Sequence, residues 1–357
     1  MMAARTIYFL NDYSMAEARR RWMAGDYPGH HMWGMNAVET MGWDVEFSPS
    51  PRPKLMPDVK LPGLNANNRF QLELAAAPPK QRNVYCGSIH IFKLLGLLKS
   101  AGLFRRKLIA MVHHPVTPSA VNRRALRSAD ALFYLNQFAH DRTVAAMPEL
   151  RGRSHVLGWC VDTAFYDAQI GQAPPSDHKL IVAAGKELRD YESLVRGVAM
   201  VDDPELKVEI YCSEETAPTA TDPRVTVYKG GRHGSSISYL DLLGRYRDAI
   251  AIAIPMKPVD RTVGMTSVFD GFAARRAMMI TRHPCIDAPL EAKELGIVVE
   301  PNSAKGWAEA IHMVLADPAR VIAIGANGRA YAENALSMDD YGKRLDALFK
   351  RYFCDDQ

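Results

Sequence analysis

The chain has 357 residues, 48% of them hydrophobic and 24% charged, which is the balance of a globular protein long enough for two domains. Its net charge of +4 is too small to indicate nucleic-acid binding, and no apolar run approaches the ~20 residues of a membrane span. The five scattered cysteines lack zinc-site spacing, and the N-terminal residues lack the apolar core of a signal peptide. We therefore expect a cytoplasmic protein whose cysteines are reduced.

Short apolar strands alternate with helical segments in the first half of the chain, which is typical of an α/β domain with a parallel sheet. The predicted strands are 6–10, 43–47, 83–86, 107–112, 131–135 and 155–157. The predicted helices are 32–41, 70–77, 91–101, 123–128 and one that ends at 146. The polar segment 11–31 and the proline-rich segment 48–63 are predicted to be loops.

The turn-rich segment 158–177 is predicted to link the two domains, because the alternation starts again after it. The predicted strands of the second half are 180–184, 207–212, 225–228, 249–255, 277–280 and 296–300. The predicted helices are 192–200, 238–246, one from 268, 304–315, 319–335 and 338–353. Ligands of doubly wound sheets bind beyond the carboxyl ends of the strands, so two facing domains would place the site in a cleft between them.

The segment 260–281 contains a loop of small residues between a strand and a helix. Such a loop is suited to bind an anion, because the first N–H groups of a helix are unpaired and carry a partial positive charge. Thr266 and Ser267 could cap this helix or offer hydroxyls, and Asp270 could bind the hydroxyls of a ribose. A capped crossover helix without a ligand is the alternative interpretation.

Four passages, in this order, resemble those of GT-B glycosyltransferases of the large, retaining, family-4-like group. They are ADALFYLNQFAHD with VLGWCVDTAFYDA, the loop and helix of 185–200, the motif of 260–281, and GIVVEPNSAKGWAEAIHMVLADP. The resemblance implies an α/β protein of two Rossmann-like domains that face a central cleft. Residues 1–165 would bind the acceptor, 166–340 would bind the donor, and 341–357 would form a closing helix that crosses back to the first domain.

The resemblance also implies the transfer of a sugar from a nucleotide-diphosphate-sugar, UDP- or GDP-linked, to an acceptor hydroxyl. Retention of configuration, and chemistry without a metal or other cofactor, are further implications. Thr262 stands where the family usually has the first of two glutamates, so the contacts to the donor sugar and the stereochemistry stay open. The sugar, the base, the acceptor and the oligomeric state are not predicted.

The predicted donor site lies in the second domain and comprises Lys186, Arg189, Tyr228, Gly264, Met265, Thr266, Ser267 and Asp270. Cationic side chains would hold the diphosphate and stabilise it as it leaves. Arg189 is preferred to Lys186, because a guanidinium group matches the phosphate oxygens. A solvated surface loop is the alternative for both. Tyr228 lies near the position that the resemblance assigns to the nucleobase.

The predicted catalytic residues are Arg189 and His113. His113 follows the strand 107–112, where a histidine can hydrogen-bond a sugar hydroxyl or help the proton of the acceptor to leave. A structural histidine bonded to a loop carbonyl is the alternative. The predicted acceptor site comprises Asp26, Tyr27, His30, His31 and His114, and no metal site is predicted.

The acceptor could be a glycan, a lipid-linked molecule or a small molecule, and no nucleic-acid partner is expected. The segment 92–107 mixes leucines with five basic residues, so it could lie on the inner face of an anionic membrane. An ordinary helix packed on the sheet is the alternative.

Other functions stay open as alternatives. A non-catalytic protein of the same fold is supported by Thr262, and an epimerase would have Glu187, Asp190 and His233 as weak candidates. A phosphorylase would require a cofactor-binding lysine that cannot be placed. A dinucleotide-dependent oxidoreductase is disfavoured, because no GxGxxG follows the first strand.

Overall fold

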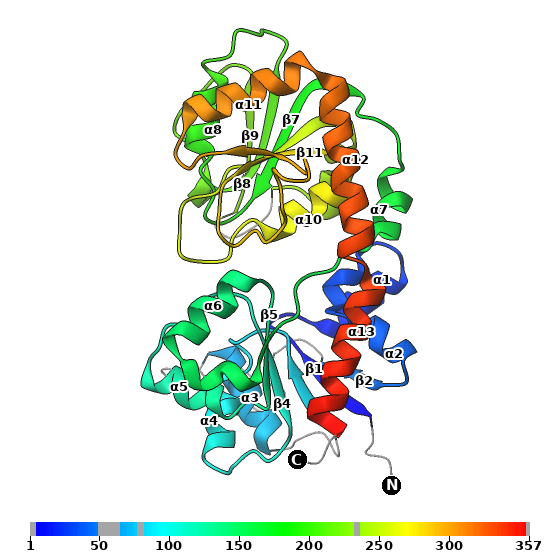
Figure 1. The fold of residues 1–357 in the computed structure, drawn as a ribbon, viewed down its shortest axis with the longest axis vertical. Coiled ribbons are helices and arrows are strands. Elements are labelled where there is room, and N and C mark those ends of the chain that lie inside the picture. Colours follow the sequence, from blue (N-terminus) through cyan, green and yellow to red (C-terminus); the bar gives the residue numbers. More distant parts are fainter. Residues whose placement is uncertain (1–4, 49–64, 77–81, 232–235, 355–357) are drawn as a thin grey trace. The chain divides into compact units, whose positions relative to one another are not determined.

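A computed structural model of the chain describes residues 5–48, 65–76, 82–231 and 236–354, which form two compact α/β units (Figure 1). The first unit comprises Met1–Cys160 with Met338–Gln357, and the second comprises Val161–Ser337. In the described residues, each unit contains one six-stranded sheet whose paired strands are all parallel. His233 and most of the predicted loop 48–63 lie outside the described residues.

The sheet of the first unit has the order β2-β1-β3-β4-β5-β6. Its strands are β1 (Thr6–Leu10), β2 (Asp44–Phe47), β3 (Asn83–Cys86), β4 (Leu108–Val112), β5 (Ala131–Tyr134) and β6 (Ser154–Val156). All the predicted strands of this half are confirmed, with bounds that differ by at most one residue. The fully buried pattern of β4 and β5 explains their continuous apolar sequences, because helices cover both faces of a parallel sheet.

Helices from both ends of the chain cover this sheet. One face packs against α1 (Met15–Met23), α2 (Met35–Thr40) and α13 (Met338–Phe349). The other packs against α3 (Ala66–Ala76), α4 (Lys93–Ser100) and α5 (Ala120–Arg127), and α6 (Gln137–Ala146) follows β5. Short helical turns lie at Gly29–Met32, Pro148–Arg153 and Lys350–Cys354. The contact of α13 includes a hydrogen bond of 2.8 Å from Trp43 Nε1 to Asp346 Oδ1.

The sheet of the second unit has the order β12-β11-β10-β7-β8-β9. Its strands are β7 (Asp177–Gly185), β8 (Lys207–Ser213), β9 (Val225–Gly230), β10 (Ala249–Ile254), β11 (Ala277–Thr281) and β12 (Ile297–Val299). One face packs against α8 (Tyr191–Val198) and α11 (Ala304–Ala316). The other packs against α9 (Tyr239–Asp248), α10 (Met265–Ala273) and α12 (Pro318–Ala335). The unit begins with α7 (Thr163–Ile170) and has a short turn at Glu214–Thr216.

Two segments predicted without helices contain them. The segment 11–31 contains α1, which begins after Ser14, whose hydroxyl caps the backbone N–H of Glu17. Only Met15 and Ala18 of α1 are buried, so its apolar pattern was too sparse to indicate a helix. The segment 158–177 contains α7, capped by Asp162.

Each sheet has a point where the strand order reverses. In the second sheet β7 and β10 are neighbours, but the chain leaves β7 through α8 on one face and leaves β10 through α10 on the other. In the first sheet the corresponding neighbours are β1 and β3. Such switch points, at the carboxyl ends of the strands, are where doubly wound sheets bind ligands.

Candidate functional site

The loop after β7 places Arg189 at the switch point of the second sheet. An antiparallel bridge joins Arg189 to Met256, and the N–H of Asp190 donates to the carbonyl of Pro255 at 3.0 Å, so this loop is tied to the end of β10. The side chain of Arg189 is buried; its Nη1 donates to the carbonyl of Glu187 at 3.1 Å and its Nη2 to Ser267 Oγ at 3.3 Å.

The guanidinium group of Arg189 has no counter-charge in the part of the chain that the structure describes. No carboxylate there forms an ion pair with it, and its buried Nε has no hydrogen-bond partner there. A buried cation is costly unless an anion compensates it, so this arrangement favours an anionic ligand. Lys186, by contrast, is exposed, and its carbonyl accepts from Ser213 Oγ at 2.8 Å.

The start of α10 lies beside Arg189. Gly264 precedes the helix with a φ of 74°, and no side chain caps it, so neither Thr266 nor Ser267 is the cap. Both lie in the first turn after Met265; Thr266 is exposed, while Ser267 is buried and donates to the carbonyl of Ala184 at 3.4 Å. The structure therefore brings together Arg189, Ser267 and the N-terminus of α10.

Asp270 is buried further along α10, beside two tyrosines that the sequence analysis did not single out. Its Oδ1 accepts hydrogen bonds from the hydroxyl of Tyr239 at 3.0 Å and from that of Tyr166, and the two hydroxyl oxygens are 2.5 Å apart. Burial raises the pKa of Asp270 to about 6, although both hydrogen bonds act to lower it. This oxygen is engaged within the protein, and the contact to a ribose stays a prediction.

Tyr228 lies on the edge strand β9. Ala184, Tyr211 and Tyr228 are in register across β7, β8 and β9, which places Tyr228 about 10 Å from β7, at two strand spacings. The rings of Tyr211 and Tyr228 stack with centroids 4.7 Å apart, and Tyr228 is 41% exposed. The side chain of Tyr228 is therefore partly open to solvent.

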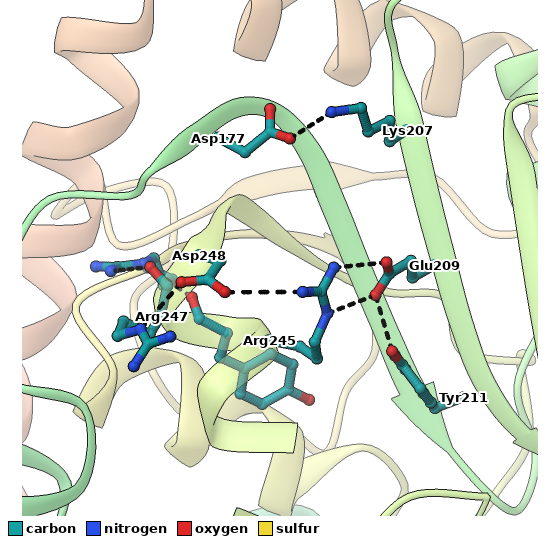
Figure 2. Close-up of polar contacts among 9 residues, drawn as sticks. Asp177, Lys207, Glu209, Tyr211, Arg245, Arg247 and Asp248 are labelled. Atoms are coloured by element: carbon teal, nitrogen blue, oxygen red, sulfur yellow. Dashed lines mark hydrogen bonds and ion pairs between the residues drawn. The ribbon is translucent and has the colours of Figure 1, made fainter. Parts of the chain in front are cut away.

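The partner ring of this stack is fixed by charged groups. The hydroxyl of Tyr211 donates to Glu209 Oε2 at 2.8 Å, and Arg245 of α9 donates to both oxygens of Glu209, as Figure 2 shows. Nη1 of Arg245 also forms an ion pair with Asp248 Oδ2 at 3.7 Å. The sequence did not indicate this network, because it joins residues far apart in the chain.

In the first unit, His113 follows β4. Its Nε2 lies 2.8 Å from the carbonyl of Gly87, which can only accept, so Nε2 carries the proton and Nδ1 is the acceptor. Its ring stacks on Trp33 with centroids 5.0 Å apart. Burial lowers the pKa of His113 to about 4, so the imidazole is neutral at physiological pH. His113 thus forms the hydrogen bond to a loop carbonyl that the structural alternative expects. Its Nδ1 remains for the predicted role, which is a hydrogen bond to a hydroxyl of the sugar or acceptor.

The predicted acceptor residues form two groups around this histidine. His30 and His31 lie in the turn after α1 with ring centroids 4.5 Å apart, and burial lowers the pKa of both. The ring of Tyr27 stacks on that of His31. The guanidinium group of Arg21 lies over the ring of Tyr27, and its Nε is 3.4 Å from Asp26 Oδ1.

Trp159 connects these groups to the vicinity of His113. Its ring lies 6.2 Å from that of His30 and 5.2 Å from that of Trp33, while His114 packs edge-on against His113. Trp33 and Trp159 were not predicted as site residues. Trp33 lies within the predicted helix 32–41, whereas the structure begins α2 only at Met35, and Trp159 follows a glycine in a turn-rich segment, which is too common a pattern to identify a site.

No family model matches the sequence, and no curated protein matches it. Solved structures do match. Sucrose-phosphate synthase from Thermosynechococcus elongatus is 15% identical, with a TM-score of 0.67 and 98% of each chain covered. Anabaena HepE, in complex with UDP and glucose, is 13% identical, with a TM-score of 0.62 over 98% of this chain and 100% of HepE. An α,α-trehalose-phosphate synthase (UDP-forming) from Burkholderia vietnamiensis is 13% identical, with a TM-score of 0.59 over 80% and 78%.

The chain has the GT-B fold. The predicted fold class, with two parallel sheets flanked by helices, is therefore confirmed. Within this GT-B chain, the predicted donor residues divide into a group around Arg189, a tyrosine on β9, and Asp270 among buried tyrosines. None of the described helices combines the length and the apolar character that a membrane span requires. The described residues also contain no group of three His, Cys, Asp or Glu arranged to hold a metal.

Proposed function

We propose that the protein is a glycosyltransferase that moves a sugar, a hexose in the first instance, from a nucleotide-diphosphate-sugar to an acceptor hydroxyl. The observation that carries the proposal is Arg189, a buried arginine at the switch point of the second sheet that has no counter-charge among the described residues. A diphosphate would supply the missing negative charge. Sugar transfer releases a nucleoside diphosphate, so the same cation would stabilise the leaving group.

The arrangement around Arg189 supports a phosphate more than a single carboxylate. The Nε–H of Arg189 has no hydrogen-bond partner among the described residues, and the first turn of α10, which Ser267 ties to Arg189, adds a positive dipole end. Tyr228 lies two strands, or about 10 Å, from Ala184 near the end of β7, and we propose that it contacts the base attached to the phosphates through a ribose. We propose UDP or GDP as the nucleotide, with Lys186, Gly264, Met265, Thr266 and Asp270 as further donor residues.

The first unit would bind the acceptor, through Asp26, Tyr27, His30, His31 and His114. His113 would use Nδ1 to accept a hydrogen bond from a sugar or acceptor hydroxyl, because Nε2 already donates to Gly87. Retention of configuration, independence of a metal and a cytoplasmic location are parts of the same proposal.

Thermal unfolding with UDP, GDP, ADP and dTDP, and with NAD and NADP as controls, tests the proposal. A ligand at 100 times its dissociation constant adds about 2.7 kcal/mol to stability, which is easily measured. Arg189→Ala should weaken the binding of the preferred diphosphate by roughly 1.5–3 kcal/mol, as expected for a lost hydrogen bond to a charged group. Arg196→Ala, which removes an exposed arginine of α8 paired with Glu192, is the control and should bind normally.

The absence of stabilisation by any diphosphate would overturn the proposal. Asp270→Asn should weaken the binding of the nucleoside diphosphate more than that of inorganic diphosphate. An equal loss for both would remove Asp270 from the ribose site.

A second candidate is a GT-B protein that binds the nucleotide without turnover. Thr262, only 8% exposed, supports it, since no carboxylate occupies that position beside the donor motif. Slow hydrolysis of the donor sugar in the absence of an acceptor would distinguish an enzyme from this binding protein.

A further inference from the structure

Residues 74–129 contain ten lysines and arginines but no aspartate or glutamate, in a chain whose net charge is only +4. The described part of this stretch includes β3, α4, β4 and α5 of the first unit. The proposed donor site uses none of these charges, because its cations lie in the second unit. The concentration of positive charge therefore belongs to a different surface.

The cations gather where α4 and α5 end. These helices lie side by side on one face of the first sheet (Figure 1), and Arg124 Nε of α5 donates to Ser100 Oγ, at the end of α4, at 2.9 Å. The loop 101–107 starts here and leads to the amino end of β4. Five residues at this end form what we call the basic surface: Leu103, Arg105, Arg106, Arg124 and Arg127.

The arginines of the basic surface form no ion pair with a carboxylate of the described residues, although the pKa of Glu149 is lowered by a backbone hydrogen bond, by Arg123 and by Arg127. Arg105, Arg124 and Arg127 are exposed and Arg106 is half-buried, and none of the four forms an ion pair within the described ranges. Two carboxylates close by are already neutralised by cations outside the basic surface. Asp130 accepts from Lys99 at 2.9 Å, and Glu149 accepts from Arg123 at 2.6 Å. The basic surface therefore keeps a positive potential towards solvent.

Leu103 is presented by a fixed turn among these arginines. Its N–H donates to the carbonyl of Leu98 at 2.9 Å, and that of Gly102 donates to the carbonyl of Lys99 at 3.0 Å, which together close α4 with a Schellman motif. A hydrophobic residue at this position commonly packs back onto the helix, but the side chain of Leu103 is 69% exposed. The turn thus holds an apolar side chain in solvent next to cations.

We propose that the basic surface binds an anionic lipid bilayer, with Leu103 entering the boundary between headgroups and acyl chains. Arginines attract lipid phosphates, and each cation near such a bilayer raises affinity by roughly fivefold. The apolar side chain of Leu103 adds a contribution to the binding free energy that salt does not screen. A single-stranded nucleic acid would instead require exposed aromatic rings, and Phe104, the aromatic residue of this loop, is only 3% exposed.

The location of the basic surface agrees with an anchoring role. The loop 101–107 precedes β4, whereas His113 follows it, so the basic surface and the proposed acceptor residues lie at opposite ends of that strand. Binding to a bilayer would therefore leave the carboxyl end of β4 uncovered. The proposal is independent of the donor site and of the identity of the acceptor.

Co-sedimentation of the full chain with vesicles tests the proposal. Vesicles of equal parts phosphatidylcholine and phosphatidylglycerol should bind the protein, pure phosphatidylcholine should not, and binding should decrease with added salt. Arg105→Gln with Arg127→Gln should weaken binding by roughly twenty-five-fold, at about fivefold per charge. Leu103→Ser should weaken it at high salt as well as at low salt, because the lost contact is apolar.

Matched substitutions in the second unit provide the controls. Arg196→Gln with Lys305→Gln removes two exposed charges, and Met200→Ser removes a methionine that is 55% exposed. Both should bind vesicles as the unmodified protein does. Equal binding by all variants, or equal binding to neutral vesicles, would overturn the proposal. Preference for a single-stranded RNA over anionic vesicles would also overturn it, in favour of an anionic polymer. Stabilisation by nucleotides, measured on the same variants, reports separately on the donor site.

Discussion

The guanidinium group of Arg189 lies directly against the backbone of Gly185, where a Cβ atom would be 2.5 Å from Nε and 2.7 Å from Cζ. The last residue of β7 must therefore lack a side chain for Arg189 to occupy the switch point. Gly185→Ala should displace the arginine and also lower the stability, because the φ of 155° at Gly185 is rarely adopted by residues with a side chain. We expect it to weaken nucleoside-diphosphate binding by at least roughly tenfold, the effect of losing a hydrogen bond to a charged group.

Gly244→Ala is the matched control for this substitution. Gly244 lies in α9, and nothing is within 4 Å of the position of its Cβ. It should bind normally and unfold at a slightly higher temperature, because alanine in a helix is favoured by roughly 0.5–1 kcal/mol. Calorimetric titration with the preferred diphosphate measures both variants, and normal binding by Gly185→Ala would contradict the proposed position of the phosphates.

Asp270 should make stability depend on pH. Its pKa is raised by burial from 3.8 to about 6 in the folded state, so the folded protein binds more protons than the unfolded chain between these values. Stability contributed by this group therefore falls as pH rises from about 4 to above 6, by about 3 kcal/mol in total.

The side chain introduced by Asp270→Asn cannot titrate, so the variant does not lose this stability as the pH rises. Its free energy of unfolding, relative to that of the unmodified protein, should therefore increase by roughly 3 kcal/mol across the same interval. Urea unfolding at pH 4 and pH 7.5 measures the difference. Asp202→Asn, at an exposed position, is the control. A constant difference between Asp270→Asn and the unmodified protein at the two pH values would show that Asp270 is not the buried acid described above.

Tyr166→Phe removes a hydroxyl that donates to Asp270 and lies 2.5 Å from that of Tyr239. The carboxylate then keeps the bond from Tyr239 and loses the other, so its pKa should rise further. We expect a loss of roughly 1–3 kcal/mol of stability at pH 7.5, and a smaller loss at pH 5, where the acid is protonated in both proteins.

A double-mutant cycle of Tyr166→Phe and Tyr239→Phe measures their coupling, since both hydroxyls donate to the same oxygen. Additive effects of the two substitutions would mean that the tyrosines do not act as one cluster.

His113→Ala should leave donor binding unchanged and lower the rate of sugar transfer. Because burial lowers its pKa to about 4, the imidazole does not titrate between pH 5 and 8. The substitution should therefore lower the pH–rate profile in that interval without changing its shape. His312→Ala, an exposed histidine of α11, is the control. Full activity of His113→Ala would return His113 to a structural role, as the bond to Gly87 alone would suggest.

The sequence contained enough information for the strands and for the fold. β1 and β3 have the predicted bounds, because a short apolar run between polar loops leaves little choice of where the strand begins and ends. α1 was missed because three consecutive arginines, Arg19–Arg21, obscured a helix that buries only two side chains. The hydroxyl cap from Ser14 was the available signal.

Candidate residues that are far apart in the chain could be brought together from the sequence only where they follow neighbouring strands of one sheet. Arg189 and Ser267 follow neighbouring strands, and the rule for doubly wound sheets brings such positions together. The bond between Tyr166 and Asp270 joins residues 104 positions apart, and nothing in either local sequence indicates the other. Long-range side-chain pairs of this kind depend on packing, which one sequence does not reveal.

The first unit is interrupted in the sequence, since Met338–Gln357 returns to it after the whole of Val161–Ser337. Tyr341, Leu345 and Phe349 of α13 lie in the same hydrophobic core as β1 and β4. During synthesis, the second unit is therefore complete before the core of the first can close. Until α13 emerges from the ribosome, one face of the first sheet is covered only in part, by α1 and α2, and the half of the protein that is made first is the half that finishes folding last.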